Sequence, residues 1–252
     1  RVTFLMHIPF TNWRIPMGRV IGPLALAVPG RAVLPIIQGP ARGIRWVVGS
    51  GMPNFWLGTY EREKYELFSH ELFPGMVVYD IGANVGIYTV LACRAVGANG
   101  RVYSFEPATM NLSHLNKNIQ VNGFSNCEVI PKAVSSSDGS VQFEPGSDSC
   151  IGKISAKGPI TVQSTSLNSF FTRGKRAPGL LKIDVEGAEF DVLRGALEVL
   201  VDAKPTIFLA THGENVHIRC CDFLKDLSYD LQFIASDEII ARFPSNSKAP
   251  TE

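Results

Sequence analysis

The segment from Val77 to Tyr88, which reads VVYDIGANVGIY, constrains the fold of this chain more than any other part of it. It predicts a buried strand, a glycine-rich turn and the start of a helix. The segment 101–107, RVYSFEP, predicts a second buried strand that ends in an acid, Glu106. In an open sheet of parallel strands, ligands bind at the carboxyl ends of the strands, where this turn would lie. The order of these features predicts a pocket the size of a nucleotide.

The turn and the acid together predict an adenosine-containing ligand. Glycine lets the backbone approach a ligand closely, and the first turn of a helix offers unpaired N–H groups. Glu106 stands where an acid accepts hydrogen bonds from ribose hydroxyls. A tight turn without a ligand explains the glycines equally well, but the paired acid favours a site. The residues that we expect to bind the cofactor here are Asp80, Gly82, Ala83, Asn84, Gly86, Glu106 and Pro107.

The choice of cofactor follows from what the turn lacks. A dinucleotide-binding turn has the pattern Gly-x-Gly-x-x-Gly, whereas here Asn84 stands at the second glycine and Ile87 at the third. The acid that closes the first strand, Asp80, would sit badly beside a doubly charged pyrophosphate, but it suits the sulfonium and amino groups of S-adenosylmethionine. We therefore expect S-adenosylmethionine. The alternatives are an NAD-dependent oxidoreductase and a cofactor-binding module without catalysis.

Three motifs in order, YDIGANVGIYT, FEP and KIDVEGAEFDVLRGA, resemble the FkbM-type family of S-adenosylmethionine-dependent methyltransferases. The resemblance covers about Leu57 to Leu209. The combination of motifs is specific, whereas the glycine turn alone would be weak. The resemblance implies an α/β fold with a doubly wound, mainly parallel seven-stranded sheet of the class I methyltransferase (Rossmann-like) type. It also implies O-methylation, often of a hydroxyl of a sugar or another small molecule.

The chain is expected to divide into an N-terminal arm or cap, residues 1–56, and a methyltransferase domain, residues 57–252. Alternating strand and helix patterns predict a mainly parallel sheet covered on both faces. Residues 135–171 interrupt this alternation and predict a strand-rich insertion. The other expected elements are a third strand at 127–134, one helix at 189–201, and a closing antiparallel pair at 229–234 and 238–243.

Two acids are candidates for catalysis because they follow the fourth predicted strand. Alternation along this strand places Lys182, Asp184 and Glu186 on one side. Asp184 is expected to contact the cofactor, and Asp184 or Glu186 could position an acceptor hydroxyl or take its proton if burial raises the pKa. Capping of the next helix is the alternative for such acids. We expect Glu189 to be a cap.

His212 follows the fifth predicted strand and is the first choice for the general base, because histidine titrates near neutral pH. A lone histidine is more often a structural residue. Two positions depart from the family pattern. Ala210 stands where an acid is common, and Asn168 stands where Asp is usual.

Asp184, Glu186 and His212 could together coordinate a divalent ion, as in catechol-type methyltransferases, but the sequence fixes no ligand geometry and we predict no metal. Tyr60 and Glu61 are expected to fold over the methionine end of the cofactor or over the acceptor, with helix initiation as an equal alternative. Ala133 and Val134 are expected to border the adenine, which apolar packing would explain as well.

The composition excludes several classes of partner. A net charge of +1 gives no field to hold nucleic acid. No uninterrupted apolar stretch approaches the roughly 20 residues of a membrane span. Five cysteines without a Cys-x-x-Cys spacing favour reduced thiols and a cytoplasmic location. The acceptor is expected to be the hydroxyl of a small molecule or glycan, in walls built by residues 1–60 and 135–171. Neither its identity nor the oligomeric state can be read from the sequence.

Overall fold

The structure is a computed structural model that describes residues 28–146 and 152–244. At its centre lies a seven-stranded sheet of β3 (Val77–Ile81), β4 (Arg101–Phe105), β5 (Cys127–Ile130), β10 (Leu180–Ile183), β11 (Thr206–Ala210), β12 (Asp230–Phe233) and β13 (Glu238–Arg242). The strand order is β12-β13-β11-β10-β3-β4-β5. The strands from β11 to β5 pair in parallel, whereas β13 runs antiparallel to β11 and β12. The predicted sheet and its antiparallel closing pair are confirmed.

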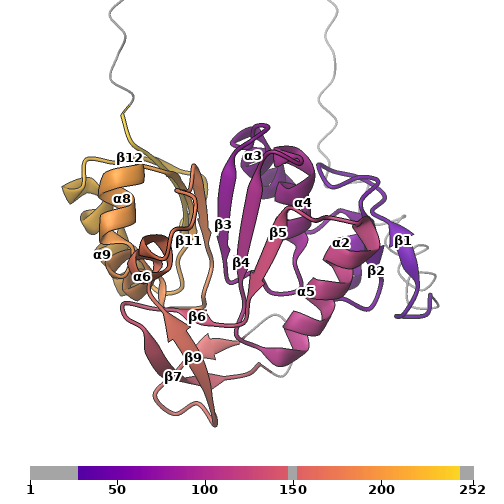
Figure 1. Cartoon of the computed structure of the whole chain (residues 1–252), viewed down its shortest axis with the longest axis horizontal. Helices are drawn as coiled ribbons and strands as arrows, with labels where there is room; N and C mark the ends of the chain where they lie inside the picture. The colour runs from indigo at the N-terminus through magenta and orange to yellow at the C-terminus, as the bar shows by residue number, and fades with distance from the viewer. Residues whose placement is uncertain (1–27, 147–151, 245–252) are drawn as a thin grey trace, which may run out of the picture.

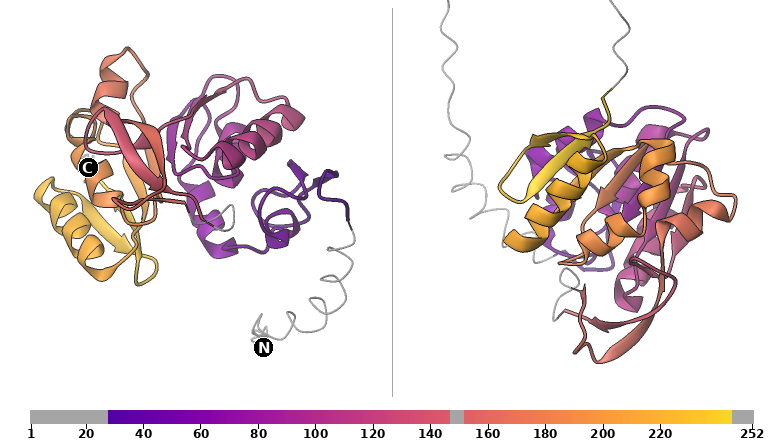
Figure 2. Two further views of the ribbon diagram at one scale, coloured as in Figure 1. Left: turned by 90° about the horizontal axis from the view of Figure 1, so that it is seen from below. Right: turned by 90° about the vertical axis from the view of Figure 1, so that its left-hand side faces the viewer.

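Helices cover both faces of this sheet (Figure 1). One face carries α3 (Arg62–His70), α4 (Ile87–Val96) and α5 (Thr109–Asn122), and the other carries α6 (Leu167–Thr172), α7 (Glu189–Arg194), α8 (Leu197–Ala203) and α9 (Glu214–Asp226). Figure 2 shows α8 and α9 in front of the sheet when the molecule is viewed from their side. Alternate residues of β3 enter different cores, Val78 on the α4 side and Tyr79 on the α7 side. Burial on both faces explains why the parallel strands are almost wholly apolar.

The described part of the N-terminal segment packs against the α5 side of the domain. It contains β1 (Val33–Pro35), β2 (Arg45–Val47) and α2 (Pro53–Leu57), with β1 and β2 antiparallel. The side chain of Asn118 accepts from the Val47 N–H at 3.0 Å, and that of Asn122 accepts from the Arg45 N–H at 2.8 Å. Trp46, which lies between Arg45 and Val47 in the sequence, is fully buried. The domain boundary at residue 56 stays a prediction, and residues 1–27 lie outside the described residues.

A second sheet lies below the carboxyl ends of the central strands (Figure 1). It consists of β6 (Ala133–Val134), β7 (Gly139–Glu144), β8 (Lys153–Ile154) and β9 (Ile160–Thr165), in the order β6-β9-β7-β8. The expected third strand at 127–134 is therefore too long. β5 ends at Ile130, because Pro131 has no N–H to continue the ladder, and Ala133 pairs with Ser164 of the second sheet instead.

The helix expected at 189–201 is also wrong, because it is broken into α7 and α8 at Gly195. The backbone of Ser135 approaches Gly195 so closely that an added Cβ would lie 2.2 Å from the Ser135 carbonyl oxygen. The side chain of Asn168 then caps the new helix start, since its Oδ1 accepts from the N–H groups of Glu198 at 3.1 Å and Val199 at 3.4 Å. The amide oxygen of Asn168 accepts these bonds as the carboxylate of the usual Asp would. The departure at Asn168 is thereby explained.

Asn168→Ala is expected to lower the free energy of unfolding by about 1 kcal/mol, because two N–H groups of α8 lose their cap. Asn168→Asp keeps an oxygen at the same place and is expected to change stability much less. Urea unfolding of both variants measures the difference. Equal stabilities for the two would mean that the side chain does not cap α8.

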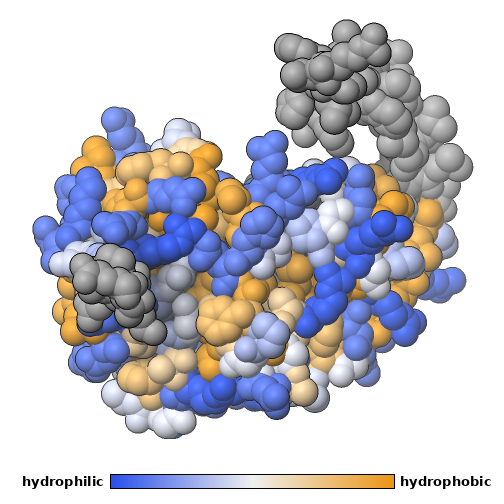
Figure 3. All heavy atoms as spheres, turned by 90° about the horizontal axis from the view of Figure 1, so that it is seen from above, coloured by the Kyte–Doolittle hydropathy of each residue, from blue (hydrophilic) through white to orange (hydrophobic). Residues whose placement is uncertain are grey.

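The face of the molecule opposite the second sheet has a mixed surface. Figure 3 shows the end of the molecule opposite the second sheet, where hydrophilic and hydrophobic residues are interspersed. Within residues 28–146 and 152–244, no helix has the length and hydrophobicity needed to cross a membrane. Cys93, Cys127, Cys220 and Cys221 are free thiols, and Cys150 lies outside the described residues. The cytoplasmic location stays a prediction.

Candidate active site

A cavity of about 240 Å³ lies at the carboxyl ends of β3, β4, β10 and β11. This is the edge at which parallel α/β sheets bind ligands. The turn after β3 and the end of β4 form one side, and the ends of β10 and β11 form another. Tyr60, Glu61 and Lys64 contribute from the start of α3, and Phe143 and Ile154 contribute from the second sheet.

Most of the residues predicted from the sequence meet at this cavity. The predicted residues that line it are Tyr60, Gly82, Ala83, Asn84, Glu106, Pro107, Ala133, Val134, Asp184, Glu186 and His212. Asp80 and Gly86 are not among the residues that line it: Asp80 is buried in β3, and Gly86 precedes α4. Ala133 and Val134 reach the cavity from the second sheet rather than from the end of β5.

The turn after β3 depends on its first glycine. Gly82 has a φ of +75°, and a Cβ added there would lie 1.8 Å from the carbonyl oxygen of Asp184. The N–H groups of Gly82 and Ala83 donate to the carbonyl oxygen of Phe105 at 3.1 and 2.9 Å. Asn84 also adopts a left-handed conformation, with φ at +52°. The residue type is fixed at Gly82 because two backbone segments nearly touch.

Glu106 is held in one orientation by the backbone around it. Its Oε2 accepts from the Asn84 N–H and its Oε1 accepts from the Ala108 N–H, each at 2.8 Å. Burial raises the pKa of Glu106, and these N–H groups oppose that increase by stabilising the charged form. The carboxylate thus has a fixed position on the cavity wall. Its free lone pairs suit hydroxyl donors such as those of a ribose.

Asp80 supports the turn from inside the fold. The side chain is fully buried, and its Oδ2 accepts from the hydroxyl of Thr89 at 2.6 Å. Its Oδ1 lies 3.4 Å from the ammonium of Lys182. These contacts support a role for Asp80 in orienting the turn. They do not support direct contact between Asp80 and a cofactor.

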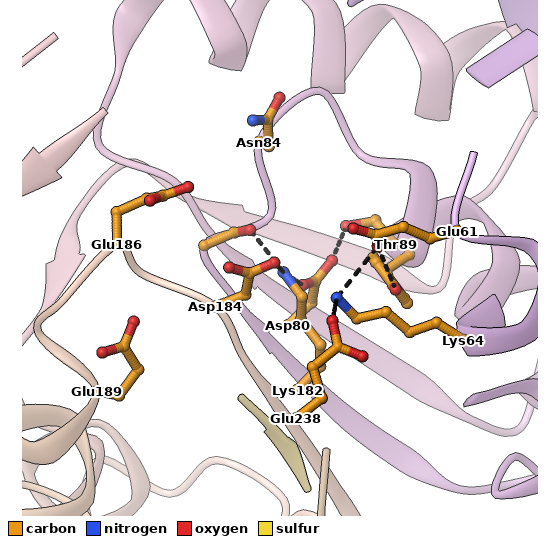
Figure 4. Close-up of polar contacts among 12 residues, drawn as sticks. Glu61, Lys64, Asp80, Asn84, Thr89, Lys182, Asp184, Glu186, Glu189 and Glu238 are labelled. Carbon is orange, nitrogen blue, oxygen red and sulfur yellow. Dashed lines mark hydrogen bonds and ion pairs between the residues drawn. The ribbon is translucent and has the colours of Figure 1, made fainter. Parts of the chain in front are cut away.

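Lys182 also lines the cavity, although the sequence predicts no role for it. Its Nζ donates to the carbonyl oxygen of Gly82 at 2.8 Å and lies 3.7 Å from Asp184 Oδ2. Figure 4 shows it between Asp80 and Asp184, so that one buried ammonium joins the turn to the end of β10. The signal in the sequence is a lysine within an otherwise apolar strand, LLKI. Such a residue needs a buried partner, since an unpaired charge is costly inside a protein.

Asp184, Glu186 and His212 converge on the opposite side of the cavity. The Nε2 atom of His212 lies 3.7 Å from Asp184 Oδ1 and 3.5 Å from Glu186 Oε2. Lys182, Lys64 and His212 lower the pKa of Asp184 although burial alone would raise it, and burial raises the pKa of Glu186. The predicted candidates for catalysis therefore form one group on the cavity wall.

Glu189 orients His212 from behind. Its Oε1 accepts from the Gly187 N–H at 2.9 Å and is also 2.8 Å from His212 Nδ1. Gly187 precedes α7 and its N-cap residue, so this bond does not cap the helix, contrary to the prediction from the sequence. The bond to Glu189, helped by Asp184 and Glu186, raises the pKa of His212 to about 9. In the chain alone, His212 must therefore lose a proton before it can act as the base that the sequence suggested.

The start of α3 closes the cavity on a further side. Lys64 forms ion pairs with Glu61, at 3.1 Å, and with Glu238 of β13 (Figure 4). Burial alone would lower the pKa of Lys64, but the two carboxylates raise it, so the side chain remains charged. Glu61 makes no capping bond with its side chain, which argues against helix initiation as its role. Sequence reasoning missed Lys64 because its partner Glu238 is far away along the chain.

Comparison with known proteins identifies the family. Residues 80–231, more than half of the chain, match the methyltransferase FkbM domain. The chain belongs to the FkbM methyltransferase family. This confirms the predicted family, methyltransferase class and cofactor, S-adenosylmethionine, and sets aside the NAD-dependent oxidoreductase.

A curated relative and two solved structures are similar over different shares of the chain. Hexuronic acid methyltransferase AglP of Haloferax volcanii is 29% identical over 145 residues, 56% of this chain and 58% of the relative. A methyltransferase FkbM structure from Methylobacillus flagellatus KT has a TM-score of 0.53 at 19% identity, and the match covers 76% of this chain and 52% of that one. A ribosomal protein L11 methylase of Lactobacillus delbrueckii subsp. bulgaricus has a TM-score of 0.52 at 13% identity, covering 81% and 87%. The two structures confirm the fold.

Proposed function

We propose that this domain transfers the methyl group of S-adenosylmethionine to a hydroxyl oxygen of a sugar, either free or within a glycan. One observation carries the proposal: a single cavity joins the turn and Glu106 on one side to Asp184, Glu186 and His212 on the other. The similarity to a hexuronic acid methyltransferase supports a sugar as the acceptor. The chain spans only 58% of the length of that relative, so acidic sugars are the first acceptors to test rather than a known substrate.

In this proposal the adenosyl group lies against the glycine turn. Glu106 accepts from the ribose hydroxyls, and the apolar side chains of Ala133 and Val134 border the adenine. The sulfonium then faces Asp184, whose carboxylate favours a positive charge, and Tyr60 covers the methionine end. Asp80 keeps the turn in place through Thr89 and Lys182.

The acceptor would enter between Glu186, His212 and the second sheet. The hydroxyl oxygen of the acceptor attacks the methyl carbon in line with the departing sulfur. The carbon–sulfur bond breaks, and the electron pair of that bond stays on sulfur. The hydroxyl proton passes to the group formed by Asp184, Glu186 and His212. Holding both reactants in this alignment supplies much of the rate enhancement.

Calorimetric titration and a transfer assay test the proposal together. Titration is expected to show binding of S-adenosylmethionine and its demethylated product at one site per chain, with no binding of NAD. Radiolabelled methyl is then followed onto glucuronic acid, glucose and glycans that contain them. Binding of NAD alone would contradict the cofactor. Binding of S-adenosylmethionine without transfer to any hydroxyl acceptor would indicate a module without catalysis.

His212→Ala is expected to lower kcat by about 10²–10⁴-fold, the usual contribution of a positioned group that handles a proton. The affinity for S-adenosylhomocysteine is expected to change little, because the adenosyl side of the cavity is untouched. His70→Ala, on the exposed end of α3, is the matched control and is expected to keep wild-type turnover. Wild-type turnover in a folded His212→Ala variant would remove His212 from the mechanism.

A further inference from the structure

We propose that Asp184, Glu186 and His212 bind one divalent metal ion of the first transition row, with Mn²⁺ and Zn²⁺ as the candidates. Each residue offers one ligand atom, and these atoms all lie within 4.8 Å of one another. The three side chains line the cavity and are 28%, 31% and 35% exposed, so an ion can reach them from solvent. They come from the ends of two neighbouring parallel strands, β10 and β11.

The distances between these atoms suit coordination better than hydrogen bonding. His212 Nε2 lies 3.7 Å from Asp184 Oδ1 and 3.5 Å from Glu186 Oε2. Hydrogen bonds between nitrogen and oxygen usually span about 2.7–3.2 Å. Ligands about 2.1 Å from a tetrahedral ion are about 3.4 Å apart, so each distance from His212 to a carboxylate is within a few tenths of an ångström of that spacing. The three ligand atoms lie within 4.8 Å of one another and would draw together around an ion.

Glu189 supplies the support that metal-bound histidines usually have. Its Oε1 lies 2.8 Å from His212 Nδ1, and a proton on Nδ1 leaves the Nε2 lone pair directed toward Asp184 and Glu186. A carboxylate behind the ring fixes the orientation and tautomer of a ligating imidazole. Glu189 is in turn held by the Gly187 N–H at 2.9 Å. In space, Glu189 therefore contacts one nitrogen of His212, and the other nitrogen faces the carboxylates of Asp184 and Glu186.

A second observation points independently to a cation. Glu189 is fully buried, and its other oxygen, Oε2, has no hydrogen-bond partner. Figure 4 shows the carboxylate of Glu189 directed toward Glu186. A buried carboxylate oxygen without a partner is costly. Lys182 is already shared by Asp80 and Asp184, so a divalent ion beside His212 would add positive charge next to Glu186 and Glu189.

The donor set indicates the kind of ion. Two carboxylate oxygens and one imidazole nitrogen suit Mn²⁺ or Zn²⁺, whereas Mg²⁺ prefers oxygen ligands and retained water. Three protein ligands leave coordination positions open toward the cavity. There the ion would polarise an acceptor hydroxyl and ease loss of its proton to solvent, because a ligated His212 Nε2 would no longer take that proton; this role rests on the proposed function. An acceptor with two adjacent oxygens would bind best, because both could coordinate.

Metal binding can be measured without cofactor or acceptor. Protein dialysed against EDTA and then against metal-free buffer is titrated with Mn²⁺, and the free ion is followed by its electron paramagnetic resonance signal. One bound Mn²⁺ per chain is expected, which Zn²⁺ displaces. Glu186→Gln and His212→Ala are expected to weaken binding at least tenfold. Asp191→Asn removes an exposed carboxylate from the same helix as Glu189 and is expected to bind like wild type.

The outcomes separate this site from the proposed function. Absence of Mn²⁺ binding, or equal binding by wild type and Glu186→Gln, would overturn the metal site. Full methyl transfer by protein that retains no metal after EDTA would overturn its role in catalysis. If wild type binds one Mn²⁺ and Glu186→Gln does not, the result would support the site even if no sugar accepted a methyl group. Glu186 is partly exposed, so its substitution is not expected to disturb folding.

Discussion

Lys182→Met is expected to lower the free energy of unfolding by about 3–5 kcal/mol, the usual cost of removing one partner from a buried ion pair. The ammonium is 4% exposed and its partner Asp80 is fully buried, so the variant leaves an unpaired carboxylate in the core. It also removes the hydrogen bond to the Gly82 carbonyl oxygen. We therefore expect weaker binding of S-adenosylhomocysteine as well. Urea unfolding and calorimetric titration measure the two effects.

Two matched variants make this result specific. Lys175→Met removes a partly exposed lysine paired with Glu128 and is expected to cost about 0–1 kcal/mol. The double variant Asp80→Asn/Lys182→Met is expected to be more stable than the sum of the single changes predicts, because it removes both charges. If Lys182→Met does not fold, recovery of folding by the double variant tests the same pair. A loss of stability no larger than that of Lys175→Met would contradict the structural role of Lys182.

Gly82→Ala is expected to weaken binding of S-adenosylhomocysteine by about a hundredfold or more, about 2.7 kcal/mol. The new Cβ would lie 1.8 Å from the Asp184 carbonyl oxygen, so the turn and the end of β10 must separate. Both segments line the cavity. Calorimetric titration gives the loss of affinity, and urea unfolding gives the accompanying loss of stability.

Gly75→Ala is the matched control for backbone strain. Gly75 has a φ of +83°, similar to that of Gly82, but an added Cβ there would meet no atom within 4 Å. It is expected to cost about 1–2 kcal/mol of stability, the usual penalty of a left-handed conformation, with wild-type affinity for the cofactor. Equal affinities for Gly82→Ala and Gly75→Ala would show that the close approach at Gly82 is unimportant for binding.

The meeting of the turn and Glu106 at one cavity was predictable because these residues lie close to one another in sequence or follow from a known order of strands. Gly82 follows its strand directly, and Glu106 closes the next one. Strand alternation placed Lys182, Asp184 and Glu186 together, and all three line the cavity. The family motifs therefore predicted both the sheet and the cavity at its carboxyl edge.

The parts that could not be predicted depend on contacts between distant segments. Lys182 bonds to Gly82 across 100 positions. The break between α7 and α8 results from the approach of Ser135 to Gly195, which no local pattern reveals. Glu189 was expected to cap a helix, but its bond to His212 appears only when β11 lies beside β10. In each case local sequence preference was overruled by packing.

Calorimetric titration of wild type and Glu106→Gln with S-adenosylhomocysteine tests most directly whether this cavity holds the adenosyl group. Wild type is expected to bind one molecule per chain. Glu106→Gln is expected to bind at least about tenfold more weakly, a loss of about 1.4 kcal/mol, because an amide replaces the carboxylate that accepts from the ribose. Circular dichroism checks that the variant is folded. No binding by folded wild type, or equal binding by both proteins, would contradict the assignment of the cavity to S-adenosylmethionine.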